Sequence, residues 1–157
     1  MTVQVPALET EFVFEARVSI DEPLVIGQSS HGLRRIIPIK GGTVEGPGFK
    51  ARVVPGGADW QFVRPDGALE LLAKYTFETD DGVLILVENR GVRFAAPDIM
   101  ERMARGEKVD PKDYYFRTTP QFEAPLNSKY EWMNRTIFVC TAERMPDGVT
   151  VLFYKVK

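Results

Sequence analysis

Alternation of apolar and polar side chains is the feature that most constrains the fold of this chain. In residues 8–20 one parity is almost entirely apolar, and the other is charged or polar except for Val13; the apolar set is Leu8, Thr10, Phe12, Phe14, Ala16, Val18 and Ile20. Successive side chains of a β-strand point to opposite faces, so this period of two predicts a long strand with one buried face. Residues 69–77 repeat the pattern and predict a second such strand.

Further segments rich in β-branched and aromatic residues predict strands at 33–40, 49–54, 60–64, 83–92, 113–119, 131–142 and 149–156. Asp-Gly pairs at 66–67, 81–82 and 147–148 lie between these segments and favour tight hairpins. The gaps are too short for the helices that a parallel sheet needs. We therefore predict sequential antiparallel pairing, with bends or bulges at the glycine pairs 41–42 and 56–57.

A length of 157 residues is typical of one domain, so we assign residues 1–157 to a single all-β domain. The predicted architecture is an antiparallel closed or nearly closed β-barrel of about 8–10 strands, with a two-sheet sandwich as the alternative. Residues 97–106 predict a short helix that begins near Pro97 and stops at Gly106. We interpret it as a connector covering a sheet edge; the alternative is a lid across the barrel mouth.

Several classes of site are excluded by scarce residues. The chain has one cysteine, Cys140, and one histidine, His31, so it holds no internal disulfide and no zinc site of several Cys or His ligands. Cys140 is interpreted as a small core residue and His31 as a loop residue. No nucleotide or metal fingerprint is present, so no cofactor and no metal are expected.

The net charge and the hydropathy of the chain limit the classes of binding partner that we expect. The net charge is −2 and the basic residues are dispersed, which argues against nucleic acid. No apolar run of about 20 residues and no signal-peptide pattern is present, so we expect a cytoplasmic protein without membrane association. Barrels that close imperfectly leave edge strands, and we expect a homo-oligomer, a dimer or higher.

Candidate site residues lie where aromatic and ionisable side chains share a strand. Asp59 and Trp60 follow a glycine pair; at the barrel mouth, Asp59 would have a raised pKa and act as an acid or base, whereas the alternative is that it fixes a turn. Tyr115 and Arg117 share one strand face and suit an anionic or carbonyl-bearing ligand; the alternative is an outer-face arginine packed on an aromatic ring.

A third cluster shares one parity near the C-terminus. Tyr130, Trp132 and Asn134 present two rings and an amide on one strand face, as in a pocket wall, or alternatively belong to a core face. Arg35 and Arg93 are candidates to turn inward and pair with an acidic residue such as Asp59.

An ordered set of motifs spans nearly the whole chain. It consists of Gly46-Pro47-Gly48, Gly56-Gly57-Ala58-Asp59-Trp60, residues 75–82, Asn89-Arg90-Gly91-Val92-Arg93, Tyr115-Phe116-Arg117-Thr118, Phe122-Glu123, Tyr130-Glu131-Trp132-Met133-Asn134 and Tyr154-Lys155-Val156. In this order it resembles the domain of unknown function numbered 3237, also called uncharacterised protein family 0311. Met133 stands where that family more often has leucine, and Cys140 where a small residue is usual.

This resemblance implies a lipocalin-like β-barrel and supplies no established activity. Fungal relatives in natural-product pathways imply a small aromatic or polyketide-like ligand. Tyr75 and Phe122 fall within the shared motifs, and we expect both to contact the ligand.

Two functions are therefore predicted. The first is binding of a small aromatic or carbonyl- or carboxylate-bearing metabolite inside the barrel. The second is a cofactor-free isomerase, cyclase or lyase in which Asp59 is the base and Tyr115 and Arg117 stabilise an oxyanion. A purely structural or interaction module is a third interpretation, because it needs only the outer faces.

Overall fold

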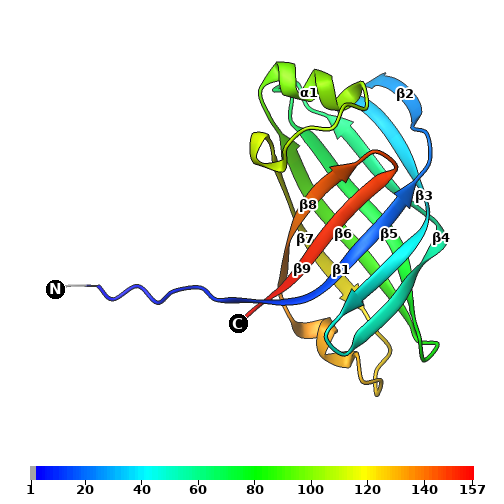
Figure 1. The fold of residues 1–157 in the computed structure, drawn as a ribbon, viewed down its shortest axis with the longest axis vertical. Helices are drawn as coiled ribbons and strands as arrows, with labels where there is room; N and C mark the ends of the chain where they lie inside the picture. The colour runs from blue at the N-terminus through cyan, green and yellow to red at the C-terminus, as the bar shows by residue number, and fades with distance from the viewer. Residues whose placement is uncertain (1–2) are drawn as a thin grey trace.

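The computed structural model describes residues 3–157, and its strands form one closed antiparallel barrel (Figure 1). In chain order the elements are β1 (Thr10–Ile20), β2 (Leu24–Ser29), β3 (Gly32–Gly46), β4 (Phe49–Val63), β5 (Leu69–Thr79), β6 (Leu84–Phe94), α1 (Pro97–Ala104), η1 (Pro111–Asp113), β7 (Tyr115–Glu123), η2 (Glu131–Arg135), β8 (Phe138–Met145) and β9 (Gly148–Val156). The order around the barrel is β1-β9-β8-β7-β6-β5-β4-β3, and pairing of β1 with β3 closes it. The predicted all-β barrel is confirmed, and β2 is an additional strand on the edge of β3.

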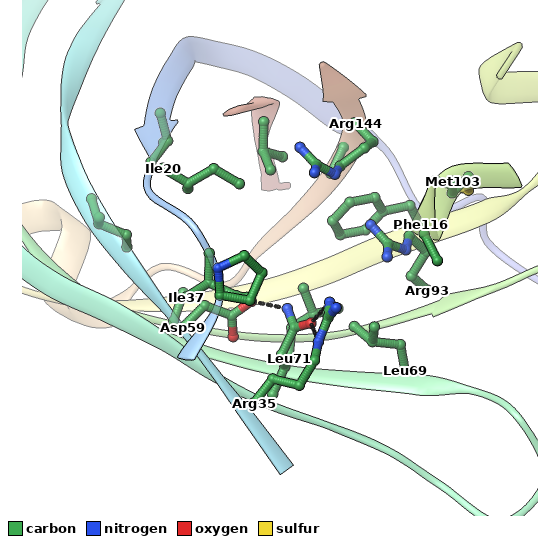
Figure 2. Close-up of a pocket in the computed structure, with 18 of the residues that line it drawn as sticks. Ile20, Arg35, Ile37, Asp59, Leu69, Leu71, Arg93, Met103, Phe116 and Arg144 are labelled. Carbon is green, nitrogen blue, oxygen red and sulfur yellow. Dashed lines mark hydrogen bonds between the residues drawn. The ribbon is translucent and has the colours of Figure 1, made fainter. Parts of the chain in front are cut away.

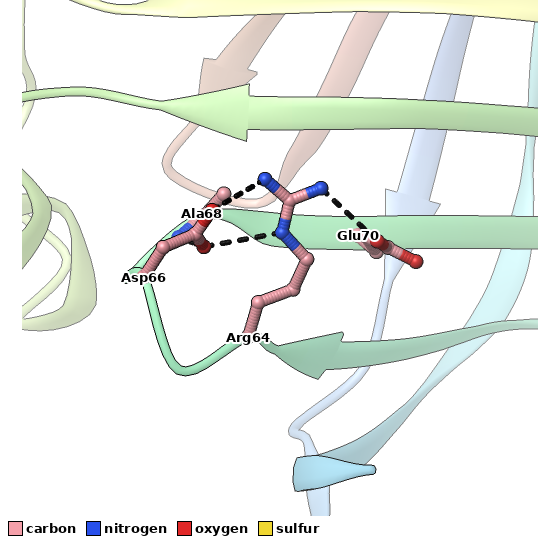
Figure 3. Close-up of polar contacts among 4 residues, drawn as sticks. All are labelled: Arg64, Asp66, Ala68 and Glu70. Atoms are coloured by element: carbon pink, nitrogen blue, oxygen red, sulfur yellow. Dashed lines mark hydrogen bonds and ion pairs between the residues drawn. The ribbon is translucent and has the colours of Figure 1, made fainter.

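Hairpins form at the predicted Asp-Gly turns between β4 and β5, β5 and β6, and β8 and β9. The first is tied by side chains (Figure 3): Arg64 contacts Asp66 at 2.6 Å and Glu70 at 3.2 Å, and Asp66 accepts a 3.0 Å hydrogen bond from the amide of Ala68. The guanidinium of Arg64 holds the pKa of Asp66 below its usual range. This network fixes the strand ends at the mouth of the barrel.

Three details differ from the sequence prediction. The segments 49–54 and 60–64 form one strand, β4, which continues through a register shift between Val54 and Ala58. Residues 131–135 are a 3-10 helix, and β8 begins only at Phe138. A register shift between Phe12 and Phe14 leaves Phe12 42% exposed, so Phe12 is not on the buried face.

The barrel interior is divided into a solid end and a hollow end. Phenylalanine rings fill the end at the β3–β4 and β5–β6 hairpins; the set is Phe14, Phe49, Phe77, Phe122, Phe138 and Phe153. Phe14 stacks on Phe49 with ring centroids 4.5 Å apart and lies 4.8 Å from Phe153. Interlocked aromatic packing of this kind carries most of the hydrophobic stabilisation of a small barrel.

The helix α1 lies across the other end, the mouth (Figure 1). Met103 is buried and packs with Met100 against the core. The preferred interpretation of this segment as a connector along a sheet edge is wrong, because its apolar side faces into the mouth. None of the helices in residues 3–157 is long and apolar enough to cross a membrane.

Candidate functional site

A cavity of about 830 Å³ occupies the mouth half of the barrel and is called the mouth cavity below (Figure 2). Its walls are largely apolar and include Ile37, Leu71 and Phe116, and α1 contributes Met100 and Met103. Apart from the buried Asp59, acidic residues such as Glu22 and Asp147 border it only at the exposed rim. The size and lining are those of a small-molecule site.

Three arginines from three strands point into the mouth cavity (Figure 2): Arg35 on β3, Arg93 on β6 and Arg144 on β8. Among residues 3–157 none of the three forms an ion pair, although Asp59 lines the same cavity. Arg35 and Arg144 are half-buried, whereas Arg93 is only 8% exposed. The inner cavity therefore carries an excess of positive charge.

Arg93 is the most desolvated of these arginines. Burial, followed by repulsion from Arg144 and Arg35, lowers its pKa to about 10. Its Nε has no hydrogen-bond partner within residues 3–157, and its guanidinium carbon lies 5.7 Å from the centroid of the Phe116 ring. A buried cation without an anionic partner is unfavourable and would be stabilised by a bound anion.

Asp59 is held by a directed chain of hydrogen bonds. Arg35 donates from Nε to Oε1 of Gln61 at 3.0 Å, and Gln61 donates from Nε2 to Oδ2 of Asp59 at 2.7 Å. The amide of Leu72 donates to Oδ1 of Asp59 at 3.0 Å, where the β4–β5 ladder is interrupted. Asp59 thus lines the cavity, and its backbone hydrogen bond comes from the neighbouring strand β5 rather than from a turn.

Burial raises the pKa of Asp59, and the bonds from Gln61 and Leu72 oppose that rise. A carboxyl with a raised pKa in a cavity is a candidate proton donor or acceptor. Asp59 and Arg35 both line the cavity, but Gln61 bridges them in place of the direct pairing that the sequence suggested.

Tyr115 and Arg117 do not converge with Asp59. They share one face of β7, as predicted, but it is the outer face: Tyr115 is 56% exposed, and the Arg117 guanidinium lies 5.5 Å from its ring centroid. Their inward neighbours Phe116 and Thr118 line the cavity instead. Trp60 also points outward and is 40% exposed, so the predicted grouping of these three with Asp59 is wrong.

Four other predicted ligand contacts lie at the solid end of the barrel. Phe122 belongs to the aromatic core, and Trp132 packs against Phe138 with ring centroids 5.8 Å apart. Tyr130 donates to Oδ1 of Asp81 at 2.7 Å, and Asn134 exchanges bonds of 2.6 and 2.9 Å with the backbone of Ala124. The 3-10 helix η2 plugs this end, so these residues do not reach the mouth cavity.

Tyr75 and Arg93 do line the mouth cavity, with residues that the sequence reasoning did not single out. Gln61, Asn89, Thr118 and Arg144 are the missed polar members. Each lies at an inward-facing position of a predicted strand or of its continuation. Arg144 is in such a continuation, since it extends the alternation of Cys140 and Ala142. Polar residues that occupy the otherwise apolar face of a predicted strand are the signal that would have identified them.

The single histidine and the single cysteine lie apart from the charged residues of the mouth cavity. His31 is exposed in the β2–β3 turn, where its Nδ1 is 3.3 Å from the Ser30 hydroxyl. Cys140 is 2% exposed, and burial raises the pKa of its thiol to about 12, so it is an inert core residue. Within residues 3–157, His, Cys, Asp and Glu side chains form no group of three able to hold a metal.

Two bacterial proteins are similar to this chain over nearly its whole length. The UPF0311 protein of Clostridium acetobutylicum is 47% identical over 147 residues, covering 93% of this chain and 92% of its own length. The UPF0311 protein RPA1785 of Rhodopseudomonas palustris is 45% identical over 151 residues, covering 96% of this chain and 98% of its own.

Solved structures share the same barrel. The conserved protein of unknown function from Rhodopseudomonas palustris superimposes with a TM-score of 0.92 at 44% identity, covering 98% of this chain and all of that one (100%). A β-barrel-like protein from Acinetobacter baumannii gives 0.84 at 38% identity, covering 99% and 100%. An enzyme from Penicillium herquei gives 0.74 at 20% identity, covering 100% of each chain, a likeness of fold alone. The profile of the family described as protein of unknown function DUF3237 matches residues 8–156, and this chain belongs to that family.

Proposed function

We propose that the protein binds a small organic acid in the mouth cavity, with the acid group against Arg93 and its neighbours Arg35 and Arg144. The observation that carries the proposal is the buried Arg93 guanidinium, whose Nε has no partner within residues 3–157. Guanidinium groups present a planar fork of donors that matches a carboxylate, phenolate or enolate. The apolar walls suit a compact aromatic or alicyclic body.

The test compares Arg93→Met with Arg90→Met. Arg90 lies on the same strand but faces solvent and pairs with Glu88 at 3.2 Å. We expect Arg93→Met to weaken binding of 3-phenylpropanoate by about a hundredfold by isothermal titration calorimetry, as for loss of a charged hydrogen bond in a desolvated site. Arg90→Met leaves the affinity within about twofold.

The stability of the same variants provides an independent readout. Removing a buried, unpaired charge raises the free energy of unfolding of Arg93→Met by about 1–3 kcal/mol in urea. Arg90→Met changes it by less than about 0.5 kcal/mol. Equal affinities of both variants for the acid, or destabilisation of Arg93→Met, contradict the proposal. Native mass spectrometry of the protein as purified tests for a molecule already bound.

A second candidate function is cofactor-free isomerisation, cyclisation or lyase chemistry. It is favoured by the cavity position of Asp59, whose pKa is raised by burial. In this scheme Asp59 takes a proton from a carbon beside a carbonyl and returns it to another atom of the same molecule. Arg93 and Arg35 would stabilise the developing enolate, since Tyr115 and Arg117 face outward.

Asp59→Asn separates the two functions. The enzyme candidate predicts at least about a hundredfold loss of turnover, larger than any loss of affinity, because the proton-transferring group is removed and the contact with Gln61 is also altered. Loss of affinity with no turnover in the unaltered protein favours simple binding.

A further inference from the structure

Three neutral polar side chains line the mouth cavity beneath the arginines: Tyr75 on β5, Asn89 on β6 and Thr118 on β7. They are only 4%, 5% and 6% exposed, and all three border the same cavity as Arg93. We call them the deep polar cluster. They come from three consecutive strands of the barrel. In the ladders, Asn89 lies two residues beyond the partner of Tyr75 (Val87) and two residues before the partner of Thr118 (Gly91).

Two atoms of the deep polar cluster have no hydrogen-bond partner within residues 3–157. They are Oδ1 of Asn89 and Oγ1 of Thr118, and both are fully buried. Buried polar atoms nearly always have a partner, because leaving one unsatisfied costs about 1–3 kcal/mol. Apart from Nε of Arg93, these are the unsatisfied buried side-chain atoms of the described chain, and all three line this one cavity.

The backbone of β6 beside Thr118 leaves room for the threonine side chain. Gly91 lies opposite Thr118 in the β6–β7 ladder. A Cβ atom at position 91 would lie 2.4 Å from Cγ2 of Thr118 and 2.5 Å from the carbonyl oxygen of Arg117. Any larger residue than glycine would therefore push Thr118 away from its present position.

The cluster is separated from the arginines along the strand. Asn89 and Arg93 are two inward positions apart on β6, which is about 13 Å of extended chain. Leu71, paired with Gly91, is apolar, whereas Thr118 lies opposite Gly91 on β7. Asp59 pairs with Ala73, which in turn pairs with Asn89. The cavity thus has three arginines near the mouth and neutral polar groups farther in, with Asp59 at the level of Asn89 along the ladders.

We infer that the deep polar cluster is a second subsite, which binds a neutral hydroxyl or carbonyl oxygen at the end of the ligand opposite its acid group. The inference rests on the proposed function, because it assumes that the arginines hold the acid group. A hydroxyl bound here donates to Oδ1 of Asn89 and exchanges a hydrogen bond with Thr118. The ligand class is therefore a two-ended hydroxy or oxo acid with a compact apolar body.

The experiment measures affinity for two probes by calorimetry, 3-phenylpropanoate and 3-(4-hydroxyphenyl)propanoate. These differ by one hydroxyl at the end remote from the carboxylate. The unaltered protein is compared with Thr118→Val and Tyr75→Phe, which remove one hydroxyl each with little change of shape. The matched controls are Thr119→Val and Tyr115→Phe, which make the same changes on the exposed outer face of β7.

We expect the hydroxylated acid to bind about tenfold more tightly to the unaltered protein, as for one or two satisfied buried hydrogen bonds. Thr118→Val reduces that ratio to about twofold and leaves the affinity for 3-phenylpropanoate unchanged. Tyr75→Phe acts in the same direction, whereas the two outer-face variants preserve the ratio.

Each outcome discriminates. If both acids bind through Arg93 with equal affinity, or if the ratio survives in Thr118→Val and Tyr75→Phe, the second subsite is overturned and the proposed function stands. If neither acid binds at all, both are overturned. A reduced ratio in the inner variants alone supports the inference.

Discussion

The hydrogen bond that Asp59 accepts from Gln61 is oriented by Arg35, a residue that Asp59 does not contact. Arg35 donates to Oε1 of Gln61, so the amide nitrogen of Gln61 must face Asp59 and donate to it. An asparagine at position 59 would meet that nitrogen with its own donor or lose the bond from Leu72. Burial nevertheless dominates and raises the pKa of Asp59.

This raised pKa predicts the sign of a pH effect. The native state holds the Asp59 proton more tightly than the unfolded state, so the group lowers the free energy of unfolding as pH rises from the unfolded-state pKa, about 3.9, through the native pKa. We therefore expect the stability of the unaltered protein relative to Asp59→Asn to fall with rising pH in that window and then level off. Urea unfolding at a series of pH values measures it.

Asp66→Asn is a control for which the pH dependence of stability is expected to have the opposite sign. Arg64 lowers the pKa of Asp66, so stability from this pair is lost as pH falls through the native pKa. The stability of the unaltered protein relative to Asp66→Asn therefore rises with pH. Slopes of the same sign for the two variants would contradict the burial argument for Asp59.

For single residues, the sequence predicts which side chains share a strand face better than it predicts which face points into the barrel. It places Tyr115 and Arg117 on one face of a strand, and they are on one face. Both faces of that strand carry an aromatic residue, so alternation alone does not say which one is inside; the inward face is that of Phe116 and Thr118. Asp59 is different, because the adjacent glycine pair indicated an irregular strand there, and β4 does shift its register against β5 between Val54 and Ala58.

Among the elements, α1 is weakly held at its start. Its N-cap residue, Ala96, makes no side-chain capping bond, and Met103 is its one buried residue. Helices of this length depend on caps and on packing, because their own hydrogen bonds are few. The helix that covers the mouth is therefore the least stable regular element near the cavity.

We expect Ala96→Ser to stabilise α1 by about 0.5–1 kcal/mol, since a serine hydroxyl accepts from an unpaired amide of the first turn. Hydrogen–deuterium exchange of residues 99–104 measures the change as slower exchange. Ala104→Ser makes the same exposed substitution at the other end of the helix and is expected to speed exchange slightly. Equal effects of both variants would show that capping does not limit opening.

Other elements show where sequence patterns fail. β2 is exposed on both faces, with Leu24, Val25 and Ile26 58%, 64% and 62% exposed, so no alternation announced it. Tyr130, Trp132 and Asn134 alternate as in a strand, yet residues 131–135 form η2, where the chain turns across the solid end before β8. The long strands with one clear inner face, β1 and β5, were predicted closely.

For the whole molecule, closure depends on the crossing of β1 and β3. Residues 39–45 of β3 pair with β1, while residues 32–36 pair with β2. At this crossing a Cβ on Gly42 would lie 2.1 Å from the carbonyl oxygen of Arg17. The close approach of β3 to β1 therefore requires that this position of β3 has no side chain.

Gly41 provides a matched control for that contact. Its φ of 152° is close to the 149° of Gly42, but a Cβ there would lie 3.6 Å from its nearest neighbour, the carbonyl oxygen of Val53. We expect Gly42→Ala to lower the free energy of unfolding by about 1–3 kcal/mol more than Gly41→Ala, because overpacking adds to a shared backbone strain. Urea unfolding measures both; equal losses would place the closing constraint elsewhere.

The division of the barrel into a solid and a hollow end makes two kinds of evolutionary change separable. Under the proposed function, substitutions among the residues around the cavity would alter which molecule is recognised, while the phenylalanine-filled end goes on holding the fold. The stability expected from removing an unpaired charge at the hollow end would leave a margin for further mutations. One scaffold can therefore diversify in specificity among relatives without first acquiring compensating changes in its core.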